Sequence, residues 1–369
     1  MKKVIKYIGL DVHKKSISIA SADQERDAET RYYGKIGHDM DQLMKVFRKF
    51  ISQGAELRCV YEAGGCGYHL YRFLTSNGID CIVVAPSKMP RKSGDRLKND
   101  KRDSMTLARL HRAGELTAIY VPNEEDEALR DLVRARGDAQ NAHKRAKQQL
   151  TAFLLRYHIV FSGKSRWSKA YFSWLADISM SHPGQQITLQ EYTDTVNMCS
   201  ERVARLTTHI RQLSEQCRLK DLIKGIQSMR GVSLIVAATL AAEIGDFSRF
   251  EHPEQIMAYL GLIPSEFSSG ERQRKGSITK TGNGHVRKAL IEAAQAYRLP
   301  ARKSRVILKR QDGVPQKICD ISWKAQLRLC GRYQQLINKG KNANVVKTAV
   351  ARELAGFVWA IAMELPRAA

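Results

Sequence analysis

The chain of 369 residues is long enough for two or three domains, and its 43% hydrophobic content allows sizeable cores. Lys and Arg number 61 against 37 Asp and Glu, so the formal net charge is +24, and the basic residues are spread along most of the chain. This charge favours nucleic acid as a partner over a membrane surface, because no basic amphipathic helix or lipidation motif stands out. Seven scattered cysteines without a CxxC pair exclude a disulfide framework and a zinc knuckle, and no apolar run is long enough to span a bilayer. We expect a cytoplasmic protein.

The first part of the chain alternates strand and helix patterns. Short apolar or alternating runs predict strands at 7–11, 16–20, 31–36, 57–61 and 79–85, and helical spacing predicts helices at 43–51, 68–76 and 100–112. Three strands followed by alternating helices and strands are typical of a ribonuclease-H-like mixed sheet. We assign residues 1–122 to this α/β domain.

The rest of the chain is predicted to be all-α. In the central segment, residues 123–221, an apolar three-and-four spacing continues for about three heptads, through Val196, Cys199, Val203, Leu206, Ile210, Leu213 and Cys217. A coiled coil between subunits and a helical hairpin within one chain both fit this pattern. Residues 157–190 give no clear pattern. Residues 222–369 are predicted to form a mostly helical domain with a Gly- and Ser-rich interruption at 261–284 and a terminal helix at 346–363.

Four carboxylates stand where a metal site would need them. Asp11 and Glu62 end two different predicted strands, and Asp100 and Asp103 lie three apart on one face of a predicted helix start. Hard divalent cations prefer such oxygen ligands, and magnesium leaves room for phosphate and water. Each acid alone has an ordinary alternative, such as a turn residue or, for Asp100, a helix N-cap. The glycine-free sequence after Asp11, residues 12–15, argues against the phosphate turn of actin-like ATPases.

A serine next to a glycine lies in the interruption of the C-terminal helices. Ser269 precedes Gly270 and can stand exposed on a tight turn, where nearby cations could hold a phosphate. The cations that we expect to contact nucleic acid are Arg272, Arg274, Lys275, Lys280, Arg287 and Lys288. A polar loop whose hydroxyls only bind phosphates is the alternative, and Ser268 is a neighbouring candidate for the nucleophile.

These residues resemble one known family. The N-terminal matches are residues 4–14, Tyr61-Glu62-Ala63, Ala85-Pro86 and Asp100-Lys101-Arg102-Asp103, and the C-terminal ones lie at 245–250, 259–264, 269–270, 278–280 and 282–283. They are similar to the DEDD, RuvC-like domain and the C-terminal transposase domain of bacterial insertion-sequence transposases of the "one-ten" family. The match covers nearly the whole chain except 157–190. One departure is Met229-Arg230-Gly231-Val232-Ser233, where the family usually has a Pro-Gly-Ile/Val-Gly turn.

The resemblance implies a bridge-RNA-guided serine recombinase acting on double-stranded donor and target DNA in a bacterial, nucleoid-associated setting. Asp11, Glu62, Asp100 and Asp103 would hold two magnesium ions, for which manganese could substitute, and Ser269 would form a transient phosphoserine. A coiled coil would join the two domains. Dimers would pair into tetramers, with the metal site of one subunit and the serine of another forming a composite site.

Two other functions fit the same residues. A metal-only endonuclease resembling a Holliday-junction resolvase would use the four acids and an activated water, leaving Ser269 as a phosphate contact. A non-catalytic nucleic-acid-binding scaffold would need none of these acids. The transposase is the function that we expect from the sequence.

Overall fold

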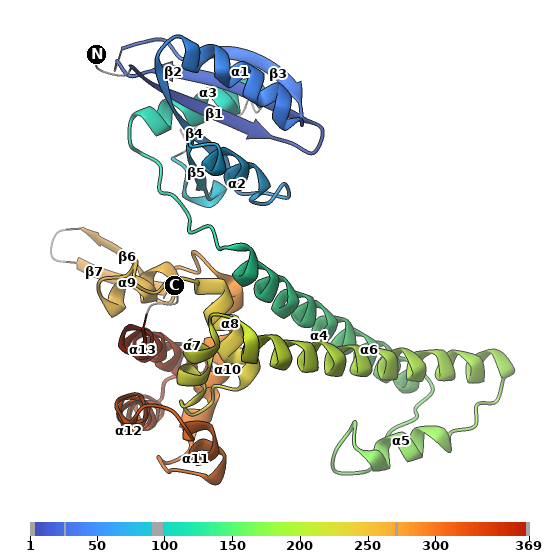
Figure 1. Cartoon of the computed structure of the whole chain (residues 1–369). Coiled ribbons are helices and arrows are strands. Elements are labelled where there is room, and N and C mark those ends of the chain that lie inside the picture. The colour runs from blue at the N-terminus through green and yellow to red at the C-terminus, as the bar shows by residue number, and fades with distance from the viewer. Residues whose placement is uncertain (1–3, 26, 91–98, 270–271, 367–369) are drawn as a thin grey trace. The chain divides into compact units, whose positions relative to one another are not determined.

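The computed structural model describes residues 4–25, 27–90, 99–269 and 272–366, and the side chains of residues 268, 269, 272 and 273 lie outside that description. The chain forms two compact units, Met1–Val121 and Pro122–Ala369 (Figure 1). The first unit is a mixed α/β fold, and helices dominate the second. A division of the second unit between residues 221 and 222 stays a prediction.

A five-stranded sheet organises the first unit. Its strands are β1 (Val4–Val12), β2 (Ser16–Asp23), β3 (Arg31–Gly37), β4 (Ala55–Glu62) and β5 (Asp80–Val84), in the order β3-β2-β1-β4-β5. Strands β1, β2 and β3 pair antiparallel, whereas β1, β4 and β5 run parallel. All five strands coincide with the apolar or alternating runs of the sequence, which confirms the mixed sheet.

Helices cover both faces of this sheet (Figure 1). Helices α1 (Met40–Ser52) and α2 (His69–Ser76) share one core with the sheet, built from residues such as Phe47, Leu74 and Leu10. Helix α3 (Asp100–Arg112) packs on the other face, where Leu107 contacts Val60. A short 3-10 turn, η1 (Pro86–Lys88), follows β5. Each large apolar side chain buried in these layers contributes about 1.5–3 kcal/mol to folding.

Gly9 lets α3 approach the centre of the sheet very closely. A Cβ atom at this position would lie 2.1 Å from the Ser104 carbonyl oxygen and 2.5 Å from the Ala108 amide nitrogen, both in the α3 backbone. Neither backbone atom can move without moving the helix. The distance between β1 and the first turns of α3 is therefore set by the missing side chain of Gly9.

Gly9→Ala is expected to push α3 away from β1 and to destabilise the first unit by about 1–3 kcal/mol or more, because overpacked cores lose energy to backbone shifts. Thermal unfolding of the full chain followed by near-UV circular dichroism would measure this loss. Gly37→Ala is the matched control, since its Cβ would meet only the Gln42 side chain at an ordinary 3.6 Å. Equal melting temperatures for the two variants would contradict this account of Gly9.

Two long helices open the second unit. They are α4 (Glu124–Arg156) and α6 (Pro183–Gln216), with the short α5 (Lys169–Ala176) between them (Figure 1). Leu129 near the start of α4 shares a core with Ile210 near the end of α6, and Leu150 near the end of α4 shares another with Leu189. The two helices are therefore antiparallel and pack within one chain. Pairing of this hairpin between subunits stays a prediction.

The other helices of the second unit follow α6 in the chain, and each is shorter than α4 and α6. They are α7 (Lys220–Gln227), α8 (Leu234–Ile244), α9 (Pro253–Tyr259), α10 (Gly284–Ala294), α11 (Arg305–Gln311), α12 (Gln316–Asn338) and α13 (Ala343–Glu364), with a 3-10 turn, η2 (Gln295–Arg298), after α10. Every residue from Ala237 to Ile244 in α8 is buried, and most of them are apolar, as expected for a helix that is surrounded by other elements. The predicted terminal helix is α13, which contributes a full buried face to the same core.

A two-stranded hairpin interrupts these helices. Strands β6 (Pro264–Ser269) and β7 (Arg272–Ile278) pair antiparallel, with Ser269 opposite Arg272 at the end of the ladder. The sequence predicts only a Gly- and Ser-rich interruption here. The run is polar and charged, so it lacks the alternating apolar pattern by which strands are found.

Candidate functional site

The carboxyl ends of β1 and β4 bring Asp11 and Glu62 to the same edge of the sheet. Leu10 of β1 is paired with Tyr61 of β4 in parallel register, and the two acids follow these residues. Gly9 and Val60 face α3, and side chains alternate along a strand, so Asp11 and Glu62 face the α3 side as well. The expected convergence of these two strand ends is therefore present in the fold.

The first turn of α3 adds the other two acids. Asn99 is the N-cap of this helix, and its side chain accepts a hydrogen bond from the Arg102 amide at 2.8 Å. Asp100 and Asp103 occupy the first turn, where the helix dipole favours negative charge. Asp100 is therefore not the cap, and the alternative explanation that the sequence left open for it is wrong.

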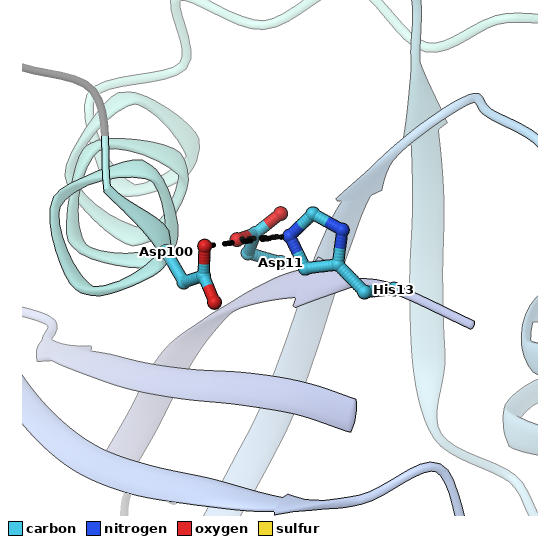
Figure 2. Close-up of side chains that lie close together, drawn as sticks. All are labelled: Asp11, His13 and Asp100. Carbon is cyan, nitrogen blue, oxygen red and sulfur yellow. Dashed lines mark hydrogen bonds and ion pairs between the residues drawn. The ribbon is translucent and has the colours of Figure 1, made fainter. Parts of the chain in front are cut away.

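Two of the four acids meet around a histidine (Figure 2). His13 Nε2 lies 3.1 Å from Asp11 Oδ2 and 3.5 Å from Asp100 Oδ1. One ligand atom from each of these three residues lies within 4.8 Å of the others, which is close enough to hold one metal ion. Lys35 Nζ donates a hydrogen bond of 2.8 Å to the second oxygen of Asp100. Positive or polar nitrogen atoms thus contact both carboxylates.

The electrostatics of this cluster favour a cation. Burial raises the pKa of the Asp11 carboxyl, His13 opposes the rise, and the charges of Asp100 and Asp103 add to it. The hydrogen bond from Lys35 lowers the pKa of Asp100 below its ordinary value. The negative charges of the acids therefore repel one another, and nearby positive charge reduces this repulsion. A divalent cation would supply that charge through the oxygen ligands that magnesium and manganese prefer.

His13 and Lys35 are two residues of the cluster that were not predicted from the sequence. His13 follows Asp11 by two residues at the end of a predicted strand. Side chains two residues apart on a strand lie on the same face, so the pattern Asp-x-His indicated that these two side chains could meet. Lys35 offered no such signal, because it lies in β3, 65 residues before Asp100, and meets it only through the fold.

The second unit holds Ser269 and the predicted DNA-contacting cations. Ser269 is the last residue of β6, and its side chain, like that of Arg272, lies outside the described residues. Arg274 and Lys275 of β7 are exposed, as are Lys280 beyond the hairpin and Lys288 on α10.

Arg287 has a structural role that the sequence did not predict. Its Nη1 donates hydrogen bonds of 2.9 Å to the carbonyl oxygens of Leu260 and Thr281, one on each side of the β6–β7 hairpin. The guanidinium thereby ties together the two chain segments at the base of the hairpin.

A buried carboxylate stabilises the same end of the β6–β7 hairpin, where its two chain segments meet α10. Glu243 accepts hydrogen bonds of 2.7 and 2.8 Å from Arg134 and one of 2.7 Å from Asn283, the N-cap of α10. Burial alone would raise the pKa of Glu243, but these donors outweigh it, and the pKa lies below its ordinary value. This network connects α4, α8 and the start of α10 around the segment that leaves the hairpin. No pattern in the sequence pointed to it.

The acidic sheet edge and the strong positive charge together suit an enzyme that processes nucleic acid, and comparison with known proteins agrees. Residues 224–306 match the model described as transposase IS116/IS110/IS902 family, and residues 8–159 match a DEDD transposase model of the IS110 group, described as transposase. Among the described residues, no helix combines the length and apolar character needed to cross a membrane.

Individual relatives give the same result. The chain is 45% identical to a putative transposase, y4qE, of Sinorhizobium fredii, over 97% of this chain and 88% of the relative. It is 31% identical to the transposase for insertion sequence element IS1533 of Leptospira borgpetersenii, over 92% of this chain and 99% of the relative. A pilin gene-inverting protein of Moraxella bovis is 26% identical over 61% of this chain and 62% of the relative. The chain belongs to the IS116/IS110/IS902 family of insertion-sequence transposases, which are enzymes that cut and rejoin DNA, and its DEDD domain indicates use of a divalent metal.

Proposed function

We propose that this transposase breaks and rejoins DNA strands at a magnesium site formed by Asp11, Glu62, Asp100 and Asp103, with Ser269 as the nucleophile. The observation on which this depends is the meeting of Asp11 and Asp100 around His13 at the edge of the sheet. Two magnesium ions, or manganese in their place, fit the supply of carboxylate oxygens there. The strand order supports a RuvC-like assignment for the first unit.

The chemistry follows from the attack of a hydroxyl on a phosphodiester. Ser269 Oγ attacks the phosphorus, the bond from phosphorus to one nucleoside oxygen breaks, and that oxygen leaves with a proton while the serine loses its own. A DNA hydroxyl then attacks the phosphoserine and releases the serine, so the bond energy is retained without ATP. A bound divalent cation would stabilise negative charge on the phosphate oxygens. Arg274, Lys275, Lys280 and Lys288 supply exposed positive charge for the DNA backbone.

A covalent adduct is the direct test of this proposal. With Mg²⁺ and donor DNA carrying the ends of the element, denaturation in detergent should leave protein attached to DNA, and digestion should yield a peptide phosphorylated at Ser269. Chelation of the metal should prevent the adduct. Nicked DNA without any adduct would contradict the serine chemistry and favour hydrolysis.

A metal-only endonuclease is the second candidate. It is favoured by one observation, which is that the acidic cluster is assembled from residues of the first unit alone. Water would then be the nucleophile, and Ser269 would only contact phosphate. The name of the gene-inverting relative describes a reaction in which DNA is both cut and rejoined, and this supports the recombinase over the endonuclease.

We propose further that a bridge RNA selects the donor and target sites, and that dimers pair into tetramers in which one subunit's acids and another subunit's Ser269 act together. The resemblance of the chain to RNA-guided members of its family supports both. RNA that co-purifies with the protein should be encoded in the non-coding segment beside its gene. Purified active protein that is free of such RNA would contradict the guidance.

A further inference from the structure

His13 brings a nitrogen atom into the acidic cluster at the edge of the sheet (Figure 2). Its Nε2 lies 3.1 Å from Asp11 Oδ2 and 3.5 Å from Asp100 Oδ1, and one ligand atom of each residue lies within 4.8 Å of the others. An imidazole in this position can either pair with the acids or bind a metal ion together with them. The two roles predict different metals and different effects of removing the histidine.

The distances within the cluster suit three ligands of one ion. Two ligand atoms bound next to each other in octahedral geometry, with bonds of about 2.1 Å, lie about 3.0 Å apart. His13 Nε2 and Asp11 Oδ2 are already close to that separation, and Nε2 and Asp100 Oδ1 are slightly further apart. Small side-chain rotations are therefore enough for the three atoms to bind the same ion.

The backbone holds His13 in place before any ion arrives. His13 follows β1 directly and closes the β1–β2 turn through two hydrogen bonds with Ser16, one of 2.9 Å from the His13 amide and one of 3.4 Å from the Ser16 amide. The His13 carbonyl oxygen also lies 2.7 Å from His38 Nδ1. The imidazole itself is half exposed, so an ion can reach it from solvent. A ligand fixed in this way loses little freedom on binding.

Lys35 determines which oxygen of Asp100 is left for an ion. Its Nζ donates a hydrogen bond of 2.8 Å to Asp100 Oδ2, whereas Oδ1 is the oxygen 3.5 Å from His13 Nε2. Asp100 therefore offers one oxygen on the side of His13. The three residues together present two carboxylates and one imidazole nitrogen, which is a mixed ligand set.

A nitrogen ligand changes which metal such a position prefers. Magnesium binds oxygen ligands and gives up its water reluctantly, whereas the first-row transition dications accept imidazole together with carboxylate. Manganese is the member of that series that also suits carboxylate and water ligands. An imidazole beside two carboxylates therefore favours manganese over magnesium.

We propose that His13 is a metal ligand, and that with Asp11 and Asp100 it forms an ion position that prefers manganese over magnesium. The inference rests on the proposed metal site for its two acids. It adds to that site a fifth ligand residue and a metal preference, neither of which follows from the four acids alone.

Electron paramagnetic resonance of Mn²⁺ bound to the full chain, without DNA, tests the proposal directly. A pulsed measurement should detect coupling between the manganese electrons and the nitrogen of a bound imidazole, and His13→Gln should remove that coupling. His69→Gln is the matched control, because His69 is an exposed histidine on α2, the helix on the sheet face opposite to α3. Absence of nitrogen coupling in the wild type, or its survival in His13→Gln, would overturn the proposal.

Metal affinity gives a second measurement of the same role. His13→Gln should bind Mn²⁺ about 10- to 100-fold more weakly. Its affinity for Mg²⁺ should change by less than about 3-fold, because the glutamine still offers an oxygen atom. If His13 only pairs with the carboxylates, its removal frees them, and Mn²⁺ binding should be equal or tighter. That result, or an equal loss for both metals, would overturn the proposal.

Asp11→Asn separates this inference from the proposed function. It should weaken Mn²⁺ binding whether or not His13 is a ligand. If Asp11→Asn binds Mn²⁺ as the wild type does, the proposed acidic site fails, and the inference fails with it. If Asp11→Asn loses Mn²⁺ while His13→Gln keeps both its affinity and the nitrogen coupling, the proposed function stands and only the role of His13 is overturned.

Discussion

Asp11→Asn should lower DNA cutting by roughly three orders of magnitude while leaving DNA binding unchanged. The amide keeps the shape of the side chain and can still contact His13 Nε2, which lies 3.1 Å from the carboxylate, but it loses the negative charge that a divalent cation needs. Cutting of donor DNA, followed over a range of Mg²⁺ concentrations, would measure the loss.

The same variant should not be less stable than the wild type. Because burial raises the pKa of Asp11, the stability that its neutral form provides is complete at low pH and is lost as the pH rises through the folded-state pKa. An uncharged asparagine keeps that stability at neutral pH, so the melting temperature should be unchanged or higher. Loss of activity without loss of stability is typical of a residue kept for function.

Asp41→Asn is the matched control, because it removes an exposed carboxylate in the first turn of α1. Its cutting activity and its response to Mg²⁺ should equal those of the wild type. If Asp11→Asn cuts as well as this control, Asp11 holds no essential metal, and the scaffold or another acidic site becomes the better account.

The places of the four acids in the fold could be predicted from sequence, because each acid lies at the end or the start of a local element. Asp11 and Glu62 follow apolar strands, and Asp100 and Asp103 open a helix, so each position is set by a short pattern. The parallel register of β1 and β4 then brings the strand ends together. Lys35 and the Arg134–Glu243–Asn283 network could not be found in this way, since their partners are 65, 109 and 40 residues distant in the chain.

Two segments of the second unit escaped prediction for different reasons. The β6–β7 hairpin is held by backbone pairing and carries an exposed, charged sequence, so it has no buried face to produce a period of two. Residues 157–190 are held instead by aromatic contacts, such as those of Tyr171 with Phe161 and Trp167. Trp167 also has a positive φ of 63°, which breaks any regular pattern there.

Ser269→Ala should abolish both cutting and the covalent adduct, with a loss of about four or more orders of magnitude, because no other hydroxyl would replace the nucleophile. Ser268→Ala is the matched control, as it removes the neighbouring hydroxyl from the same strand, one residue further from the end of the ladder. It should keep cutting within a few-fold of the wild type.

The endonuclease alternative makes the opposite prediction for this pair. If water is the nucleophile, Ser269→Ala still cuts in Mg²⁺, oxygen from labelled water enters the new phosphate end, and only the salt dependence of binding changes. Loss of activity in Ser268→Ala but not in Ser269→Ala would move the nucleophile by one residue and keep the serine chemistry. Because both variants leave the acidic cluster untouched, their comparison separates the role of the hydroxyl from that of the metal site.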